Sequence, residues 1–251
     1  MIYILIFISG ICLGSFYNVV GMRALKNESI IKPASHCPKC HHHLKWYELI
    51  PILSYLFLRG KCRQCKAHIS LVYPLIELLT GILFIFSYLK FGFSLNFIIA
   101  IIIASILVII YLTDFSEYII LDLTLIIGVL AIATLQYMDI GINFLYGLLN
   151  GLGLFIFMYL VKLVGDKIFK RESLGGGDIK LSFLIGQVIG WQLGLVSLIV
   201  ASFLAFPYAL IVSTFKHQRE VPFGPFLITA LLIIFFKIDL FQDVLNILLR
   251  R

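Results

Sequence analysis

The chain has 251 residues, of which 61% are hydrophobic and 13% are charged, and its formal net charge is +7. Soluble domains contain roughly 45–50% apolar and about 25% charged residues, and a domain of this size buries only around 70–75% of its surface. The composition therefore excludes an ordinary water-soluble fold and predicts an all-α polytopic membrane protein. A net positive charge could suggest a nucleic-acid partner, but in a membrane protein the distribution of the charge along the chain matters more than its sum. We therefore expect no nucleic-acid partner.

Eight membrane-spanning helices are expected, because each needs about 20 mainly apolar residues. The sixth segment is short and contains Gly186, Gln187 and Gly190. The eighth is interrupted by Lys237 and Asp239, so its last residues are expected to lie along the membrane interface. The eight segments lie near residues 1–22, 71–89, 94–113, 119–137, 142–164, 179–193, 194–215 and 222–240.

The basic residues predict the orientation in the membrane. With the loop 23–70 in the cytoplasm, 16 of the 20 Lys and Arg residues lie on the inner side. Cytoplasmic loops are enriched in these residues, so both chain termini are expected outside the cytoplasmic membrane. The start of the chain lacks the basic segment and cleavage site of a removable signal peptide.

Residues 23–70 form the only long polar stretch. We therefore divide the chain into a first transmembrane helix (1–22), a cytoplasmic loop domain (23–70) and a transmembrane helical catalytic domain (71–251). The loop contains two CxxC pairs, Cys37 with Cys40 and Cys62 with Cys65, separated by 21 residues. Two such pairs supply four thiolates to a structural Zn²⁺, although the usual separation is about 15–20 residues.

Disulfides and free thiols are the alternatives to a zinc site. A reducing cytoplasm disfavours disulfides, and a loop too small to form its own core is typically stabilised by a metal. Five histidines beside the cysteines are interpreted as solvated surface, and Cys12, in the first apolar segment, as a small buried hydrophobe. The histidines are His36, His41, His42, His43 and His68.

Two aspartates lie at the inner ends of apolar segments, where a charge is costly unless function or pairing retains it. Asp114 ends the apolar run 101–113, and Asp178 follows three glycines and precedes the run 179–189. The predicted topology places both at the cytoplasmic boundary. Each also has an ordinary explanation, because Asp178 fits a helix N-cap and Asp114 could merely end its helix.

A pair of carboxyl groups at one depth can hydrolyse a peptide bond. Two neighbouring carboxyls share one proton, since both cannot easily ionise. The ionised one takes a proton from water, and the protonated one donates to the carbonyl oxygen and then to the leaving amine. Gly175, Gly176 and Gly177 would let an extended substrate approach closely, and the stretch 165–178 is expected to be a mobile loop that closes over it.

Several motifs resemble those of the bacterial prepilin peptidases, the type IV leader peptidases among the GxGD-type intramembrane aspartyl proteases. The stretch GGGDIKL at 175–181 matches their GxGD region, and GSFYNVV at 14–20 resembles their N-terminal signature. Three more motifs resemble their cytoplasmic domain and one the start of their second span. They are SHCPKC at 35–40, LIPILSY at 49–55, RGKCRQC at 59–65 and YPLIELL at 73–79.

The resemblance implies roles for particular residues. Asp114 and Asp178 would be the catalytic pair, and Asp122 matches a supporting aspartate that usually follows proline, whereas Leu121 precedes it here. It also implies cleavage of a basic leader from type IV prepilins or prepilin-like proteins of pilus assembly and protein secretion. Members with the cysteines commonly methylate the new N-terminus with S-adenosylmethionine, although the sequence has no Rossmann-type glycine motif for that cofactor.

Two other functions stay open at this point. A transporter or scaffold with a zinc-bound loop could place carboxylates along a substrate path, but its interrupted, repeated helices are not evident. A methyltransferase with structural aspartates is the second alternative.

Overall fold

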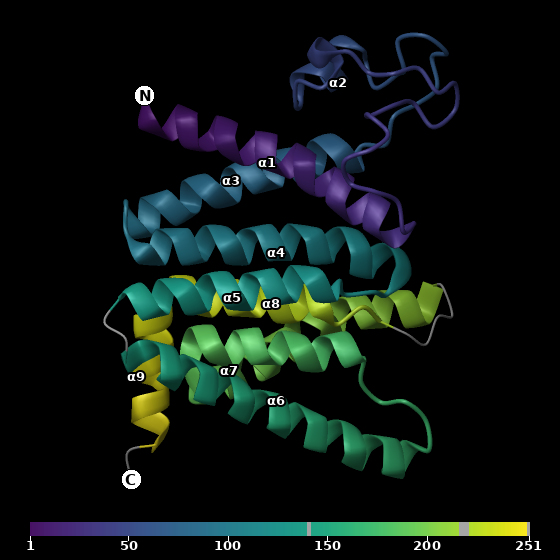
Figure 1. The fold of residues 1–251 in the computed structure, drawn as a ribbon. Coiled ribbons are helices and arrows are strands. Elements are labelled where there is room, and N and C mark those ends of the chain that lie inside the picture. The colour runs from purple at the N-terminus through teal and green to yellow at the C-terminus, as the bar shows by residue number, and fades with distance from the viewer. Residues whose placement is uncertain (140–141, 216–220, 250–251) are drawn as a thin grey trace. The chain divides into compact units, whose positions relative to one another are not determined.

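The computed structural model describes residues 1–139, 142–215 and 221–249, and it is helical throughout (Figure 1). It forms two compact units, residues 1–93 and 94–251. In the described ranges no strand is present, apart from the isolated bridges His36–His43 and Lys61–His68. The predicted all-α class is therefore confirmed.

The first unit is an antiparallel helix pair with a polar excursion between its helices. It comprises α1 (Ile2–Leu25), the 3₁₀ helix η1 (Trp46–Glu48), α2 (Leu53–Phe57) and α3 (Val72–Phe91). Small residues allow α1 and α3 to approach closely, as they do in many membrane helix pairs. A Cβ added at Gly10 would lie 2.8 Å from Gly81 Cα, and one at Gly14 would lie 2.9 Å from Glu77 Cα.

Two buried polar side chains form hydrogen bonds at one end of this pair: Asn18 links α1 to α3, and Glu77 links α3 to the excursion. Asn18 donates from Nδ2 to the carbonyl of Tyr73 at 3.1 Å. Glu77 accepts the backbone N–H of Ile52 at 2.7 Å. Ile52 has φ 61°, a conformation that is strained for a β-branched residue. The carboxylate of Glu77 therefore fixes a turn that the local sequence would not adopt by itself.

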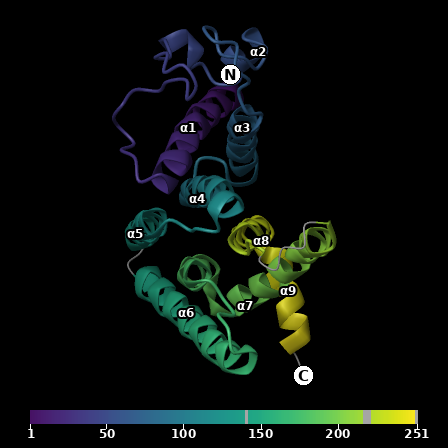
Figure 2. The same ribbon diagram turned by 90° about the vertical axis from the view of Figure 1, so that its right-hand side faces the viewer.

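The second unit contains α4 (Leu95–Glu117), α5 (Asp122–Met138), α6 (Ile142–Phe169), α7 (Gly176–Phe215), α8 (Gly224–Phe236) and α9 (Ile238–Leu249). Much of the core lies along α4, where Ile103, Ala104 and Val108 are fully buried. The α4–α5 and α6–α7 connections lie at one end of this unit and α9 at the other (Figures 1 and 2).

Helix α7 is 40 residues long and bends sharply at Gly190, which has φ 80° and ψ 164°. A straight helix of this length would measure about 60 Å, twice the thickness of a bilayer core. The predicted sixth and seventh spans are the two arms of this element. The predicted interruption of the last segment is also present, because α8 ends before Lys237 and α9 continues at 90° to it.

The predicted number of eight spans is not confirmed. All eight segments coincide with helices, but only five helices in the described ranges are both long and apolar enough to span a membrane. The bent pair α8 and α9 raises the number to six. The difference arises because α5 has only 17 residues and α7 is counted once. Large apolar side chains such as Phe203, Leu130 and Phe86 are exposed, as expected for helices that face lipid.

The close packing of α1 on α3 yields a first prediction. Gly10→Ala should lower the melting temperature of the purified protein, because the new methyl meets the backbone of Gly81 and overpacking costs about 1–3 kcal/mol. Gly153→Ala in α6 is the matched control, since its methyl would have its nearest neighbour at 3.8 Å. Thermal unfolding in detergent should rank Gly10→Ala below the natural chain and Gly153→Ala at or above it; the reverse order would contradict the packing.

Candidate functional site

Asp114 lies one turn before the end of α4 and is almost completely buried. Its Oδ2 accepts the backbone N–H of Gly224, the first residue of α8, at 3.1 Å. A Cβ at Gly224 would lie 2.8 Å from this oxygen, so only glycine lets α8 begin so close to the carboxyl. Helix α4 continues to Glu117 and ends at Tyr118, which has a left-handed conformation. Asp114 therefore does not end its helix, so the alternative explanation that it is only a helix-terminating residue is wrong.

Asp178 is the third residue of α7 and is half-buried. It lies in the first helical turn, where the helix dipole favours a carboxylate, but it is not the N-cap residue. A Cβ on Gly175 would approach Asp178 Oδ2 to 3.2 Å. Asp178 therefore does not occupy the N-cap position that the alternative explanation required.

Ile120, in the α4–α5 connection, brings the two aspartates to the same end of the unit. Its side chain would lie 2.8 Å from a Cβ on Gly177 and 2.7 Å from one on Gly224. Gly177 precedes Asp178, and Gly224 bonds to Asp114, so one side chain contacts the neighbours of both acids. The expected convergence of residues 64 positions apart is therefore present in the fold.

The third aspartate, Asp122, begins α5 and forms an ion pair with Lys180. Both of its carboxylate oxygens lie 2.7 Å from Lys180 Nζ, and both side chains are more than half exposed. Lys180 is two residues after Asp178 on α7. The ion pair between Asp122 and Lys180 therefore connects the start of α5 to the helix that carries Asp178. An exposed pair contributes little to stability, which suits a positioning role better than a proton-transfer role.

The three glycines do different things. A methyl on Gly177 would collide with Ile120, whereas one on Gly176 would have no atom within 4 Å. Helix packing therefore accounts for Gly177, and only Gly176 leaves open space beside Asp178. The expected approach of a substrate backbone is compatible with Gly176 alone.

The connection before these glycines is shorter than the loop expected at residues 165–178. Helix α6 continues to Phe169, and α7 begins at Gly176. Ser173 donates from Oγ and from its backbone N–H to Asp166 Oδ1, at 2.8 and 2.7 Å. Lys162 bonds to Glu172 at 2.7 Å. These bonds anchor Glu172 and Ser173 of the connection to α6.

The four cysteines of the first unit form a cluster. The sulfurs of Cys37, Cys40, Cys62 and Cys65 lie within 4.8 Å of one another, and the pairs Cys37–Cys65 and Cys40–Cys62 are 3.8 and 3.9 Å apart. Four sulfurs bound tetrahedrally at about 2.3 Å from one ion would be about 3.8 Å apart. All four are free thiols. The donor set and its dimensions fit a metal ion and do not fit disulfides.

The two CxxC turns have the same backbone. In each, the N–H of the residue after the second cysteine donates to the carbonyl of the first, His41 to Cys37 at 2.9 Å and Lys66 to Cys62 at 3.0 Å. His41 and Lys66 both have positive φ, 56° and 57°. Such turns direct backbone N–H groups at the first sulfur of each pair, which is the usual construction of a knuckle.

Backbone donors prepare the first cysteine of each turn to be a thiolate. The N–H groups of Cys40 and Lys39 lower the pKa of Cys37 to about 6, and those of Cys65 and Gln64 lower the pKa of Cys62. Although the N–H of His42 acts in the opposite direction, burial and the neighbouring sulfurs raise the pKa of Cys40 to about 12. Thiolates this close repel one another, so a metal ion bound here would supply the charge that lets several of them coexist.

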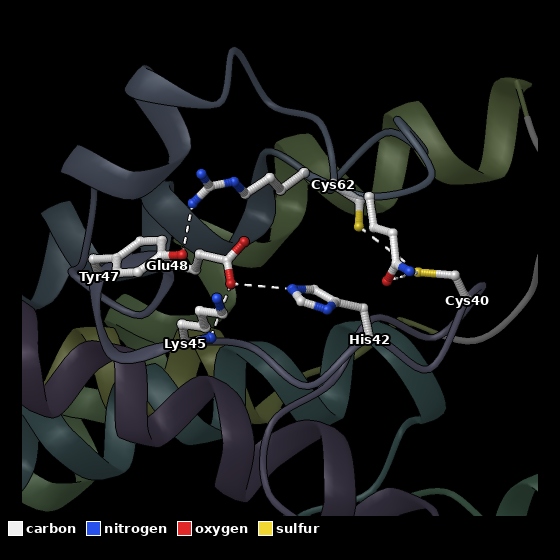
Figure 3. Close-up of polar contacts among 8 residues, drawn as sticks. Cys40, His42, Lys45, Tyr47, Glu48 and Cys62 are labelled. Atoms are coloured by element: carbon white, nitrogen blue, oxygen red, sulfur yellow. Dashed lines mark hydrogen bonds and ion pairs between the residues drawn. The ribbon is translucent and has the colours of Figure 1, made fainter.

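The ring of His42 points away from the cysteines and toward Glu48 (Figure 3). Its Nε2 lies 3.2 Å from Glu48 Oε2, which also accepts the backbone N–H of Lys45 at 2.9 Å. Burial by itself would raise the pKa of Glu48, but these two contacts outweigh it and lower the pKa. Arg63 donates to the Tyr47 hydroxyl at 2.7 Å and stacks on its ring.

Two interpretations of side chains in the first unit were wrong. His42 is part-buried and bonded to Glu48, so it is not solvated surface like His41, His43 and His68. Cys12 is exposed on α1, not buried. At a position inside a membrane helix, exposure to lipid is compatible with a small apolar side chain.

Gly224 and Lys180 contribute to the site but were not predicted from the sequence. Gly224 lies in the segment Val221-Pro222-Phe223-Gly224-Pro225, and a glycine between two prolines is a strong turn signal. That signal at the inner end of the last apolar segment could have placed a helix start beside Asp114. Lys180 gave no such signal, because its partner Asp122 is 58 residues away.

Two family models match the chain. Residues 8–91 match the family model of the bacterial peptidase A24 N-terminal domain, and residues 101–210 match that of the type IV leader peptidase family. No solved structure matches the chain.

Curated relatives carry the name prepilin leader peptidase/N-methyltransferase. The protein of Myxococcus xanthus is 38% identical over 200 residues, which are 79% of this chain and 59% of that protein. The protein of Bacillus subtilis is 34% identical over 88% of both chains. The protein of Vibrio cholerae is 32% identical over 95% of this chain and 98% of its own length.

The contact between Gly177 and Ile120 yields a second prediction. Gly177→Ala should lower the melting temperature, because the methyl collides with Ile120, whereas Gly176→Ala should not, because its methyl meets nothing. Adding Ile120→Ala to Gly177→Ala should recover much of the loss, since the two side chains interact directly. Thermal unfolding of these three variants and of the natural chain tests this; equal melting temperatures for the two glycine variants would contradict it.

Proposed function

The chain belongs to the type IV leader peptidase family, and on this basis we propose that it cleaves the leader peptides of type IV prepilins or prepilin-like proteins with Asp114 and Asp178. The observation that carries this proposal is the convergence of the two acids, from α4 and α7, at one end of the second unit. The family does not support the alternative of a transporter or scaffold.

The proposed reaction uses the two carboxyls as one acid and one base. The ionised carboxyl removes a proton from water as its oxygen attacks the scissile carbonyl. The protonated carboxyl donates to the carbonyl oxygen, and the resulting tetrahedral intermediate collapses as the amine leaves with a proton. The N–H of Gly224 holds Oδ2 of Asp114 and thereby orients that group. Asp122 and Lys180 position the Asp178 helix and transfer no proton.

We further propose that cleavage occurs at the cytoplasmic boundary of the cell inner membrane, with the N-terminus outside and the loop 23–70 in the cytoplasm. The distribution of basic residues supports this orientation. A substrate can then insert its apolar helix in the membrane while its basic leader remains in water. The scissile bond is accessible there, because unwinding it in hydrocarbon would expose unpaired backbone groups.

The same protein is proposed to methylate the new N-terminal amine with S-adenosylmethionine, which would supply the methyl group. The names of the relatives support this activity. The residues that would bind this cofactor are not identified. Proteolysis and methylation are therefore separable in an assay that weighs the product.

The carboxyl pair yields a third prediction. Asp114→Asn and Asp178→Asn should each abolish leader removal, because a single acid cannot both activate water and protonate the leaving amine. Asp122→Asn should retain much of the activity, because its carboxylate is exposed and only pairs with Lys180. Mass spectrometry of a prepilin incubated with purified enzyme and S-adenosylmethionine measures loss of the leader and gain of a methyl group. Cleavage by either of the first two variants, with normal membrane insertion, would disprove the proposed mechanism.

We propose that the metal is Zn²⁺, on the basis of the four-sulfur donor set, and this yields a fourth prediction. Purified protein should contain about one zinc per chain, as a tetrahedral four-thiolate site requires, and Cys62→Ser should lose it. The variant should become sensitive to proteolysis within residues 23–70, whereas the helices of the second unit stay resistant. Elemental analysis that finds no zinc, together with four rapidly alkylated thiols, would disprove the metal assignment.

A further inference from the structure

A second polar site lies in the second unit, far from the acids. A cavity of about 570 Å³ is lined by parts of α4, α5, α6, α7, α8 and α9. Leu95 and Asn96 line it at the start of α4, 19 residues before Asp114, which corresponds to about 28 Å along a helix. This is nearly the thickness of a bilayer core. The cavity therefore lies toward the membrane face opposite the carboxyl pair.

The cavity collects the amide side chains of this unit. Every Asn and Gln side chain that the structure describes between residues 94 and 251 lines it, seven in all. Three come from the helix interiors, namely Gln136, Asn150 and Gln187. Such a concentration in an otherwise apolar bundle is expensive, because polar groups in a membrane protein require partners.

Two hydrogen bonds join residues that line the cavity. The bend at Gly190 is held by Asn150, whose Oδ1 accepts the N–H of Trp191 at 3.0 Å. Gln136 donates from Nε2 to the carbonyl of Gln187 at 2.9 Å. The site is thus built by specific bonds around an interrupted helix, a construction that membrane proteins use to bind ligands within the bilayer.

One polar atom in this site is unpaired. Gln187 is 2% exposed, and its Nε2 donates to the carbonyl of Val129 at 3.2 Å. Its Oε1 is buried and has no hydrogen-bond partner. A buried acceptor without a donor costs about 1–3 kcal/mol. Gln187 lines the cavity, and a ligand that donates a hydrogen bond to this side chain would remove that cost.

The charge of the lining restricts the class of ligand. Among the described residues that line the cavity, Asp139 is the one charged residue, and none is Lys, Arg or His. An anionic group would have no counter-charge, so phosphate, sulfate and carboxylate do not fit. Amides both donate and accept, which matches hydroxyl groups. Tyr146 and Trp191 add aromatic surface.

We propose that this cavity binds a neutral polyhydroxyl group, carried either by the sugar headgroup of a lipid or by a free sugar. The rim on α9 presents Gln242 and Asn246 to the cavity, while Leu240 and Leu248 on the same helix are exposed as lipid-facing residues are. A headgroup can therefore bind between these amides while its acyl chains remain in the membrane. The site is separate from leader cleavage and does not depend on the proposed function.

The fluorescence of Trp191 reports occupancy directly. The chain has two tryptophans, so Trp46→Phe leaves Trp191 as the only one. This protein is placed in phosphatidylcholine nanodiscs that contain diglucosyl diacylglycerol, and in a second series maltose is added to plain nanodiscs. A saturable change with the glycolipid alone assigns a lipid-borne ligand, and a change with maltose as well assigns a free sugar. Phosphatidylglycerol should give no saturable change, because its phosphate has no cation here.

Three variants identify the cavity as the binding site. Gln187→Leu should weaken binding by about tenfold or more, because the unpaired acceptor is lost. The double variant Gln242→Leu/Asn246→Leu should do the same, and it keeps the proposal testable if Gln187→Leu does not fold, since both residues are exposed on α9. Asp243→Leu, an exposed neighbour outside the cavity lining, is the matched control and should bind normally.

Three results would overturn the proposal: no saturable change with either sugar probe, an equal change with phosphatidylglycerol, or equal affinities of the cavity variants and the Asp243→Leu control. None of these results bears on leader cleavage, which is measured separately by the mass of the prepilin.

Discussion

The arrangement of the second unit depends on how a buried carboxyl at the end of α4 is satisfied. Asp114 is 5% exposed and obtains its hydrogen bond from the first backbone N–H of α8, not from a side chain. This contact is possible because residue 224 has no Cβ. Ile120 packs against the same glycine and against Gly177, so the start of α8 and the start of α7 are fixed by one side chain. The position of Asp178 relative to Asp114 therefore follows from backbone packing around two glycines.

Much of this site was predictable from sequence, for physical reasons. A carboxylate at the boundary of an apolar segment is costly, which made Asp114 and Asp178 candidates that the family resemblance then favoured. Paired CxxC turns have few uses besides metal binding. The positions of apolar segments predicted the helices, but not the number of spans, because Gly190 joins two arms in one element. The ion pair of Asp122 with Lys180 and the bond of His42 to Glu48 were not predictable. Each depends on which helix ends or turns the fold brings together.

The first unit shows how a small polar segment is held without a core of its own. The cysteine cluster organises its middle, and Glu77 binds its chain to α3 through the strained residue Ile52. The motif LIPILSY at 49–55 resembles the family, but the sequence alone did not explain what these residues do in the structure. The structure supplies one, because the bond between Ile52 and Glu77 links this motif to YPLIELL at 73–79. Two motifs separated in sequence are thus two sides of one contact.

The repeated backbone of the two cysteine turns has a consequence for chain entropy. Each turn closes a loop of only a few residues, and bringing the two turns together closes one of 21 residues between Cys40 and Cys62. Because closure entropy grows only with the logarithm of loop length, doubling that segment would cost about 0.6 kcal/mol. Structural zinc sites contribute roughly 10–16 kcal/mol. The spacing between the pairs, slightly longer than usual, is therefore nearly free thermodynamically. The intervening residues do not need to bind a metal. Their sequence can therefore serve the contacts that Glu48 and Ile52 make.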